Sequence, residues 1–494
     1  MTESSVRPTY GNWRKPPRPG IGPLGLLGTA VLLGGLIVAL LAALASWIAA
    51  LAIGAADAVV VAPLAIRTAD GRAAFSVIAA RAGWARRRAS GETTYVSGPL
   101  SPRPRGQFRP PGLLAPIEML EGRDAYDRAF GVLHNAAVST FTIVLGCDPD
   151  GGALVDPEQV DIWVAQWGGW LAGLAHEPGL LGATVIVETA PDPGTRLATE
   201  VLPLLDPRAP ARARALMTEV VASYPAASSE TSTYVTLTYG PGGTRRRGDT
   251  VTDLAIRLPG LAGGLAAAGA GSVRPVPAER IAGAVRVAYD PAAAAPVLQA
   301  RAQTGTSGLR WEDAGPGSVE ESLDAYFHES AVSRSWVACE APRGTVRSSV
   351  LRGLLEPSPR IGRKRVAILY RPEDPASAAR IVESDRRSAH FMAGSTTGLV
   401  NARASATVRA AEQAAAEEAA GAGLVEFGLV VTATVDTPGE LSAADAEVAN
   451  LAATARLRLR VARGQQGTAF ATAVPAGVLP WLHTLLPHQL RRAL

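Results

Sequence analysis

The sequence predicts a membrane-anchored α+β protein, in which an N-terminal two-helix transmembrane hairpin precedes two cytosolic ferredoxin-like β-α-β lobes. Residues 21–66 are apolar and include one charge, Asp57. Beyond them, β-rich runs alternate with helix-like segments on either side of an Ala/Gly/Pro-rich stretch. We therefore expect a basic flexible cytosolic tail (1–20), the hairpin (21–66), an Arg/Pro-rich juxtamembrane stalk and linker (67–112), a first lobe (113–330) and a second lobe (331–494).

The apolar run of 46 residues is long enough for two membrane spans, because one span needs about 20 apolar residues. We expect the spans at residues 23–41 and 45–63, with a turn at 44–47. A signal peptide has a much shorter apolar core. Asp57 falls in the second span, where an ionisable group contacts another helix or subunit, relays protons, or lies at a solvated end.

The charges that flank the apolar run predict its orientation. Four bases precede it within residues 7–20, and six bases against one acid follow within residues 66–88. Because cytoplasmic loops retain Lys and Arg, both termini are expected in the cytosol and the protein in the bacterial inner membrane, as a multi-pass protein. The residues assigned to membrane contact and topology are Asp57, Arg14, Lys15, Arg18, Arg81, Arg86, Arg87 and Arg88; the last three could also bind anionic lipid head groups.

The basic balance of the chain belongs to its N-terminal part. The first 110 residues carry 13 Lys and Arg against four acids, an excess of +9, whereas the whole chain carries +4. The remaining residues therefore carry −5. This balance argues against direct nucleic-acid binding by the body of the protein.

The first lobe is predicted from one β-α-β unit preceded by a short strand at 92–98. A continuous β-rich run at 138–147 is typical of a buried strand. The following helix has Asp156 as its N-cap and Pro157 at its first position, and it ends at Pro178. Further elements are a strand at 182–191, helices within 195–223 and a strand at 233–243.

The second lobe repeats this alternation. The expected strands lie at 333–341, 365–372 and 426–435, and the expected helices at 376–393, 402–422 and 441–459.

The motifs of the sequence predict no enzyme. Lysine occurs only at Lys15 and Lys364, and neither follows the Gly-rich loop of a Walker ATPase. The six histidines never occur at the i, i+4 spacing of a helical metal site, and a Gly-x-Ser-x-Gly elbow is missing. Asp324 and His328 could share a helical face as an acid/base pair, although a solvated helix face is the simpler interpretation. We expect no catalytic residue, cofactor or metal.

The densest basic segment of the body spans residues 342–375. It could bind phosphate or an acidic partner, or it could be a solvated strand edge whose charges prevent aggregation. The candidate partner-contact residues are Arg343, Arg347, Arg352, Arg363, Lys364 and Arg365.

Several strings resemble a known family. The basic tail and two-span hairpin resemble the PrgI/VirB-type membrane subunit of type IV secretion and conjugation systems. The segment GQQGTAFATAVPAG (464–477) is similar to part of the N-terminal domain of conjugation ATPases. The strings at 160–179, 188–197, 328–344 and 362–385 resemble an actinobacterial membrane protein family of such clusters.

This resemblance implies a place in a machine rather than a reaction. The motor domain of the ATPases is missing, so a separate secretion or conjugation ATPase and other membrane subunits are the expected partners of an oligomeric structural subunit. An EccE-type component of type VII secretion has a similar layout. A membrane-anchored enzyme and a DNA-binding adaptor remain alternatives of other classes.

Overall fold

The computed structural model describes residues 10–11, 13, 24–68, 72–99, 101, 107–149, 151, 155–223, 228–241, 247–342, 344–394 and 402–484. The chain divides into two compact units. The sheet unit consists of Met1–Asn12 and Thr94–Leu479, and the apolar-helix unit of Trp13–Thr93 and Pro480–Leu494. Tyr10 belongs to the sheet unit because its backbone exchanges two hydrogen bonds with Val346, of 2.8 and 2.7 Å.

The apolar-helix unit contains α1 (Gly25–Ala43), α2 (Trp47–Ala65) and α3 (Ala74–Ala89). Helices α1 and α2 pack against each other, and the Ser46 side chain caps α2 by accepting from the Ala49 N–H. Within the described part of the chain, α2 is the one helix long and apolar enough to cross a membrane, by length and composition.

The predicted two-span transmembrane hairpin is therefore wrong. Of the two helices, only α2 meets the length and composition of a span among the described residues, and in α1 the apolar segment described is the shorter Gly28–Ala43. The length of the apolar run did not reveal that only one of its two helices, among the described residues, has the length and composition of a span. The segment 67–112, predicted as a stalk and linker, contains α3.

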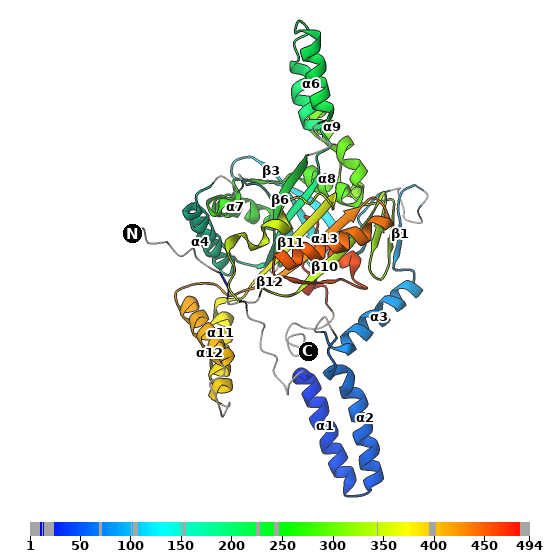
Figure 1. Cartoon of the computed structure of the whole chain (residues 1–494), viewed down its shortest axis with the longest axis vertical. Coiled ribbons are helices and arrows are strands. Elements are labelled where there is room, and N and C mark those ends of the chain that lie inside the picture. The colour runs from blue at the N-terminus through cyan, green and yellow to red at the C-terminus, as the bar shows by residue number, and fades with distance from the viewer. Residues whose placement is uncertain are drawn as a thin grey trace. The chain divides into compact units, whose positions relative to one another are not determined.

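The sheet unit is built on a single antiparallel sheet of 13 strands (Figure 1). The strands are β1 (Thr94–Val96), β2 (Ile117–Arg123), β3 (Ala129–Asn135), β4 (Thr140–Asp148), β5 (Leu180–Pro191), β6 (Ser229–Tyr239), β7 (Ser272–Pro275), β8 (Ser318–Glu321), β9 (Tyr326–His328), β10 (Ala331–Glu340), β11 (Arg363–Pro372), β12 (Val425–Val435) and β13 (Arg458–Val461). Their order is β1-β8-β9-β10-β12-β11-β5-β6-β4-β3-β2, with β7 paired to β4 and β13 paired to β10.

Helices cover both faces of this sheet. The helices of this unit are α4 (Pro157–Leu174), α5 (Thr195–Val201), α6 (Ala211–Ser223), α7 (Arg247–Leu265), α8 (Ala278–Tyr289), α9 (Ala294–Thr304), α10 (Arg352–Leu355), α11 (Pro375–Gly394), α12 (Ala402–Ala419), α13 (Leu441–Thr454) and α14 (Gln466–Thr472). Helices α4, α7, α10 and α13 pack on one face, and α8 and α14 on the other.

The sheet is a tandem duplication of one topology. In the first half β2 pairs with β3, β3 with β4, β4 with β6 and β7, and β6 with β5. In the second half β8 to β13 repeat each of these pairings. Strands β5 and β11 join the halves, with Ile186 opposite Ala367.

The predicted pair of separate ferredoxin-like lobes is therefore wrong, because one continuous sheet runs through both. The alternation of strands and helices was seen correctly at the level of sequence. The pairing between β5 and β11, which merges the halves, is a long-range contact that periodicity does not encode.

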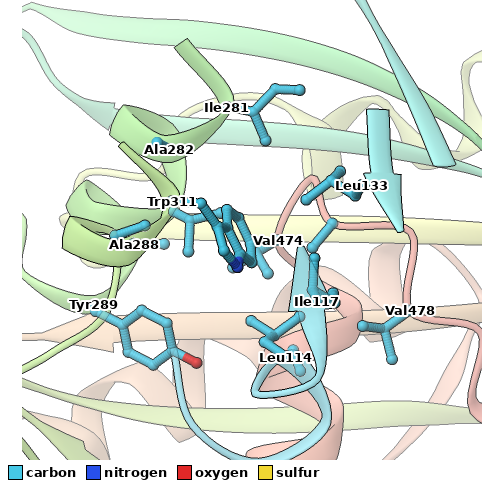
Figure 2. Close-up of a cluster of buried hydrophobic side chains, with 14 of the residues drawn as sticks. Leu114, Ile117, Leu133, Ile281, Ala282, Ala288, Tyr289, Trp311, Val474 and Val478 are labelled. Atoms are coloured by element: carbon cyan, nitrogen blue, oxygen red, sulfur yellow. The ribbon is translucent and has the colours of Figure 1, made fainter. Parts of the chain in front are cut away.

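The face covered by α8 and α14 has a large apolar core. Figure 2 shows Trp311 among Leu133 of β3, Ile281 of α8 and Val474, with Leu114 and Ile117 beside them. Trp311 and Ile281 are 2% and 0% exposed. Burial of a large apolar side chain stabilises a fold by roughly 1.5–3 kcal/mol, so this cluster fixes α8 on the sheet.

A polar seam runs through the centre of that same face. Thr142 and Thr238 share a hydrogen bond of 2.9 Å in the first half. In the second half Ser333 and Thr434 share the corresponding bond of 2.7 Å, and Ser335 and Thr432 one of 2.8 Å. These hydroxyl groups are buried, and their mutual hydrogen bonds offset the cost of removing them from water.

Two connections between neighbouring strands carry helices that leave apolar side chains exposed. Helices α5 and α6 connect β5 to β6, and α11 and α12 connect β11 to β12 (Figure 1). Leu204 is 82% exposed and Leu216 60% exposed in the first connection. Phe391 is 76% exposed and Met392 69% exposed in the second.

Candidate functional site: an arginine-lined cleft

A cleft with a volume of about 360 Å³ opens between strands β4–β7 and helices α8 and α9. Its volume lies in the range of small-molecule sites, about 300–1,000 Å³. The second half of the sheet contributes one residue, Arg363 at the start of β11. The charged residues of its lining are Asp148, Glu188, Glu230, Arg274, Arg280, Arg301 and Arg363.

Helix α8 forms one wall because its sequence is amphipathic. The residues that it packs into the apolar core on the sheet recur at helical spacing; they are Ile281, Ala282, Val285, Ala288 and Tyr289. Arg280, Ala284 and Val287 lie on the other side and line the cleft. The same helix therefore anchors the wall and presents a guanidinium group to it.

A salt bridge at Nε, the guanidinium nitrogen closest to the backbone, fixes the position of Arg301 of α9. Its Nε donates to Glu279 Oε1 at 2.9 Å, and the same oxygen accepts from the Ser307 N–H at 2.8 Å and from the Ser307 hydroxyl at 2.5 Å. These hydrogen bonds outweigh the opposing effect of burial and lower the pKa of Glu279. Arg301 Nη2 is buried against Gly283 and lacks a hydrogen-bond partner among the described residues.

Arg363 links the two halves of the sheet. Its Nη1 donates to Glu188 Oε1 of β5 at 2.6 Å, and both side chains are largely buried. Arg363 Nε is buried without an acceptor in the described part of the chain. Burial, with nearby Glu188 as the second cause, raises the pKa of Tyr234 on the cleft wall to about 12, so its phenol stays protonated.

Arg365 lies on the same sheet face, behind the cleft. It is 1% exposed, and its guanidinium group stands 4.6 Å from the centre of the Phe470 ring. Its Nη2 donates to Thr434 Oγ1 at 3.1 Å. Neither Nε nor Nη1 has a partner among the residues that the structure describes. Burial lowers the pKa of Arg365 to about 10, and the guanidinium group remains charged at neutral pH.

A buried hydrogen-bond chain continues from Arg365 to the far edge of the seam. Ser333 Oγ bonds both Thr434 Oγ1 and His328 Nε2, the latter at 2.7 Å. His328 Nδ1 lies 2.5 Å from the Tyr289 carbonyl oxygen, which can only accept, so Nδ1 carries the proton. Burial lowers the pKa of His328 to about 3, and the ring is neutral.

This arrangement has more buried donors than acceptors. Arg301, Arg363 and Arg365 together present four buried guanidinium nitrogens without a hydrogen-bond partner in the described residues. Ser333, which is hydrogen-bonded to His328, is 0% exposed. Ser333 and His328 therefore cannot act together on a substrate that arrives from solvent. The described residues hold no group of three or more His, Cys, Asp or Glu that could bind a metal ion.

The structure does not bring the predicted partner-contact residues together on one surface. Arg347 and Arg352 are exposed, and Arg343 lies outside the described residues. Arg363 and Arg365 point to the cleft face of β11. Lys364 points to the opposite face, where its ammonium group donates to the Glu356 carbonyl at 2.6 Å and burial lowers its pKa to about 8.

The membrane and topology residues fall in the apolar-helix unit. Asp57 of α2 lies against Gly35 of α1, where a Cβ on the glycine would clash with the carboxyl group. Asp57 thus contacts a helix of its own chain. Arg81, Arg86 and Arg88 of α3 are exposed, Arg87 is half-buried, and the Arg88 guanidinium stands 5.3 Å from the centre of the Trp84 ring. Arg14, Lys15 and Arg18 lie outside the described residues.

The helix considered for Asp324 and His328 is wrong. His328 belongs to strand β9 and is buried, whereas the Asp324 side chain is half exposed and pairs with Arg334 at 3.3 Å. The two side chains therefore do not form an acid/base pair. Strand β9 is three residues long and its central residue, Phe327, is itself half-buried, so the sequence offers no polar alternation that would have marked it as a strand.

Sequence reasoning missed most of the cleft. Arg280 and Arg301 lie on helices in the stretch 260–317, whose elements the sequence did not delimit. One signal was available in β11: three consecutive cations in a strand must point to alternate faces, so a strand that is buried on both faces has to bury some of them.

Comparison with known proteins adds one match. The pattern of a domain of unknown function, DUF8461, matches residues 17–76. That segment includes α1, α2 and the first residues of α3, about an eighth of the chain, and none of the sheet. No curated protein matches the sequence.

Proposed function

We propose that this chain is a non-catalytic structural subunit of a bacterial secretion or conjugation machine of the type IV-like class. In this proposal it is attached to the inner membrane, its sheet unit faces the cytosol, and it holds a separate ATPase or sister subunits. The observation that carries the proposal is the apolar surface of the two helical connections.

The first support is the exposure of large apolar side chains on these connections. Leu204 and Leu216 in one, and Phe391 and Met392 in the other, are each at least 60% exposed. Clusters of exposed apolar side chains are characteristic of surfaces that bind other proteins. Because both connections are insertions between paired strands, partner binding there leaves the sheet intact.

The second support is the combination of α2 with the basic helix α3. Helix α2 has the length and composition of a membrane span, and Arg81, Arg86 and Arg88 follow it on exposed positions of α3. Positive charge next to a span is retained on the cytosolic side. We therefore expect a reporter that works only in the cytosol to be active when it is fused after Leu479. A reporter that works only in the periplasm should be inactive at the same position.

A deletion strain tests the role in transport. Loss of the gene should stop DNA or protein transfer while the partner ATPase still hydrolyses ATP in membranes. Normal transfer without this chain would contradict the proposal.

Point variants test the surface itself. Phe391→Ser and Leu204→Ser should each abolish copurification of partner subunits from membranes. Ile256→Ser is the matched control, because Ile256 is 71% exposed on α7, outside both connections. Unchanged copurification in both variants would exclude these surfaces as the docking sites.

The identity of the copurified subunits separates the two machine classes. A conjugation-type ATPase supports the type IV-like assignment, and type VII components would instead assign the chain an EccE-like role. Turnover of a substrate by the purified full chain would replace the structural role with an enzymatic one.

A further inference from the structure

The buried surplus of donors in the cleft points to a ligand that supplies acceptors. Arg301 Nη2 and Arg363 Nε have no hydrogen-bond partner among the described residues, although both are buried. Each guanidinium group already has a carboxylate on another nitrogen, which fixes its position. A donor that is fixed, charged and unsatisfied binds an anionic oxygen more strongly than a mobile surface side chain does.

We propose that the cleft between β4–β7 and helices α8 and α9 binds a small organic oxyanion, a phosphate ester or a carboxylate. Arg301 and Arg363 hold the oxyanion, and Arg280 of α8 closes over it from the exposed side. This proposal does not rest on the proposed docking surfaces.

The cleft also has an apolar wall for the rest of the ligand. Val287 of α8 and Val297 and Leu298 of α9 line it opposite the strands. Small-molecule sites commonly combine such a wall with a few fixed polar groups that orient the ligand. A ligand with an anionic head and a compact apolar body therefore fits better than inorganic phosphate alone.

Gly283 makes room for the central arginine. A Cβ at this position would stand 2.5 Å from Arg301 Nη2, so any larger residue displaces the guanidinium group. Gly283 lies in the middle of α8, where glycine lowers helix stability. Space for Arg301 gives a physical reason for glycine at this position.

The acidic residues of the cleft do not cancel its preference for anions. Glu188 is engaged by Arg363, and Glu279, which lies outside the lining, engages Arg301. The other two acids of the lining, Asp148 and Glu230, are exposed to solvent. The unsatisfied groups in the interior of the cleft are therefore donors.

Binding is tested on the detergent-solubilised full chain by isothermal titration calorimetry. The probes are phenyl phosphate, benzoate and phenol, which share one ring and differ in charge. Phenyl phosphate or benzoate should bind, and phenol should bind at least tenfold more weakly. Equal affinity for phenol, or no binding of either anion at millimolar concentration, would overturn the proposal.

Two variants locate the site. Arg280→Gln, at an exposed position, should weaken anion binding about tenfold, the effect of losing one charge-assisted hydrogen bond. Gly283→Ala should weaken it by at least as much through displacement of Arg301. Arg310→Gln is the matched control, since the Arg310 side chain is 78% exposed outside the cleft. Unchanged affinity in both cleft variants at an unchanged melting temperature would place the anion elsewhere and refute the assignment.

Discussion

His328 makes the stability of the sheet unit depend on pH in a defined direction. The imidazole is 2% exposed and bonded at both nitrogens, to the Tyr289 carbonyl oxygen and to Ser333 Oγ. Protonation would place a second donor against Ser333 and a charge near Arg365, in a region without solvent. The folded chain therefore favours the neutral ring, and the pKa falls from 6.5 to about 3.

The size of the effect follows from this change in pKa. The unfolded chain binds a proton near pH 6.5, and the folded chain binds it only near pH 3, so the contribution is fully present above pH 6.5 and is lost as the pH falls. Each pKa unit corresponds to about 1.4 kcal/mol. Between pH 7 and pH 5 the free energy of unfolding should therefore decrease by about 2 kcal/mol through this residue alone.

Urea unfolding of the full chain in detergent measures this decrease. Far-UV circular dichroism follows the unfolding at each pH, and tryptophan fluorescence, to which the buried Trp311 and Trp336 of the sheet unit contribute, provides a second probe. The His328→Gln side chain keeps a donor and an acceptor but cannot titrate. Between pH 7 and pH 5 the free energy of unfolding of this variant should therefore decrease by about 2 kcal/mol less than that of the wild type. His390→Gln is the matched control, because the His390 side chain is 53% exposed.

Two results would refute the role assigned to His328. If the wild type and His328→Gln lose the same stability between pH 7 and pH 5, the buried neutral ring is not the cause. Detection of a protonated His328 by NMR in the folded chain at pH 6 would refute the reasoning equally.

Three further predictions follow from buried groups. Glu188→Gln leaves Arg363 without a carboxylate in a largely buried site, and should lower the free energy of unfolding, measured in urea titrations, by about 3–5 kcal/mol. A decrease below about 1 kcal/mol would show that the pair is solvated. Burial raises the pKa of Cys147 to about 12, so iodoacetamide at pH 8 should modify the half-buried Cys339 and leave Cys147 unmodified in mass spectra until urea is added. Gly477 has φ +67° and lies against Thr142, so Gly477→Ala should lower the melting temperature by several degrees, and an unchanged value would contradict this contact.

The strands and helices that were predicted correctly have strong local signals. Strand β4 is a continuous β-rich run, and helix α4 starts with Asp156 as N-cap followed by Pro157. Helices α11 and α12 are Ala-rich segments that the sequence placed within a few residues of their observed ends. Local propensity, with Pro157 at the first position of α4, was sufficient for these elements.

The union of the halves and the cleft could not be predicted, because both depend on long-range pairing. Arg363 meets Glu188 only after β11 pairs with β5, which lies about 175 residues earlier in the chain. The buried arginines also looked like surface residues, since arginine is seldom buried without a partner. Their alternation along β11 has meaning only once the strand is known to be covered on both faces.

The repeated topology gives the sheet the form of a homodimer joined into one polypeptide, with β5 and β11 paired at its centre. Strand pairing aligns Arg365 with Thr184 and Arg363 with Gly182, because Thr432 and Thr434 correspond to Thr236 and Thr238. A symmetric ancestor with arginine at both positions would have placed four cations across one junction. In this chain the equivalent positions hold Gly182 and Thr184, so the buried arginines lie on one side of the junction, where a symmetric dimer would carry them on both.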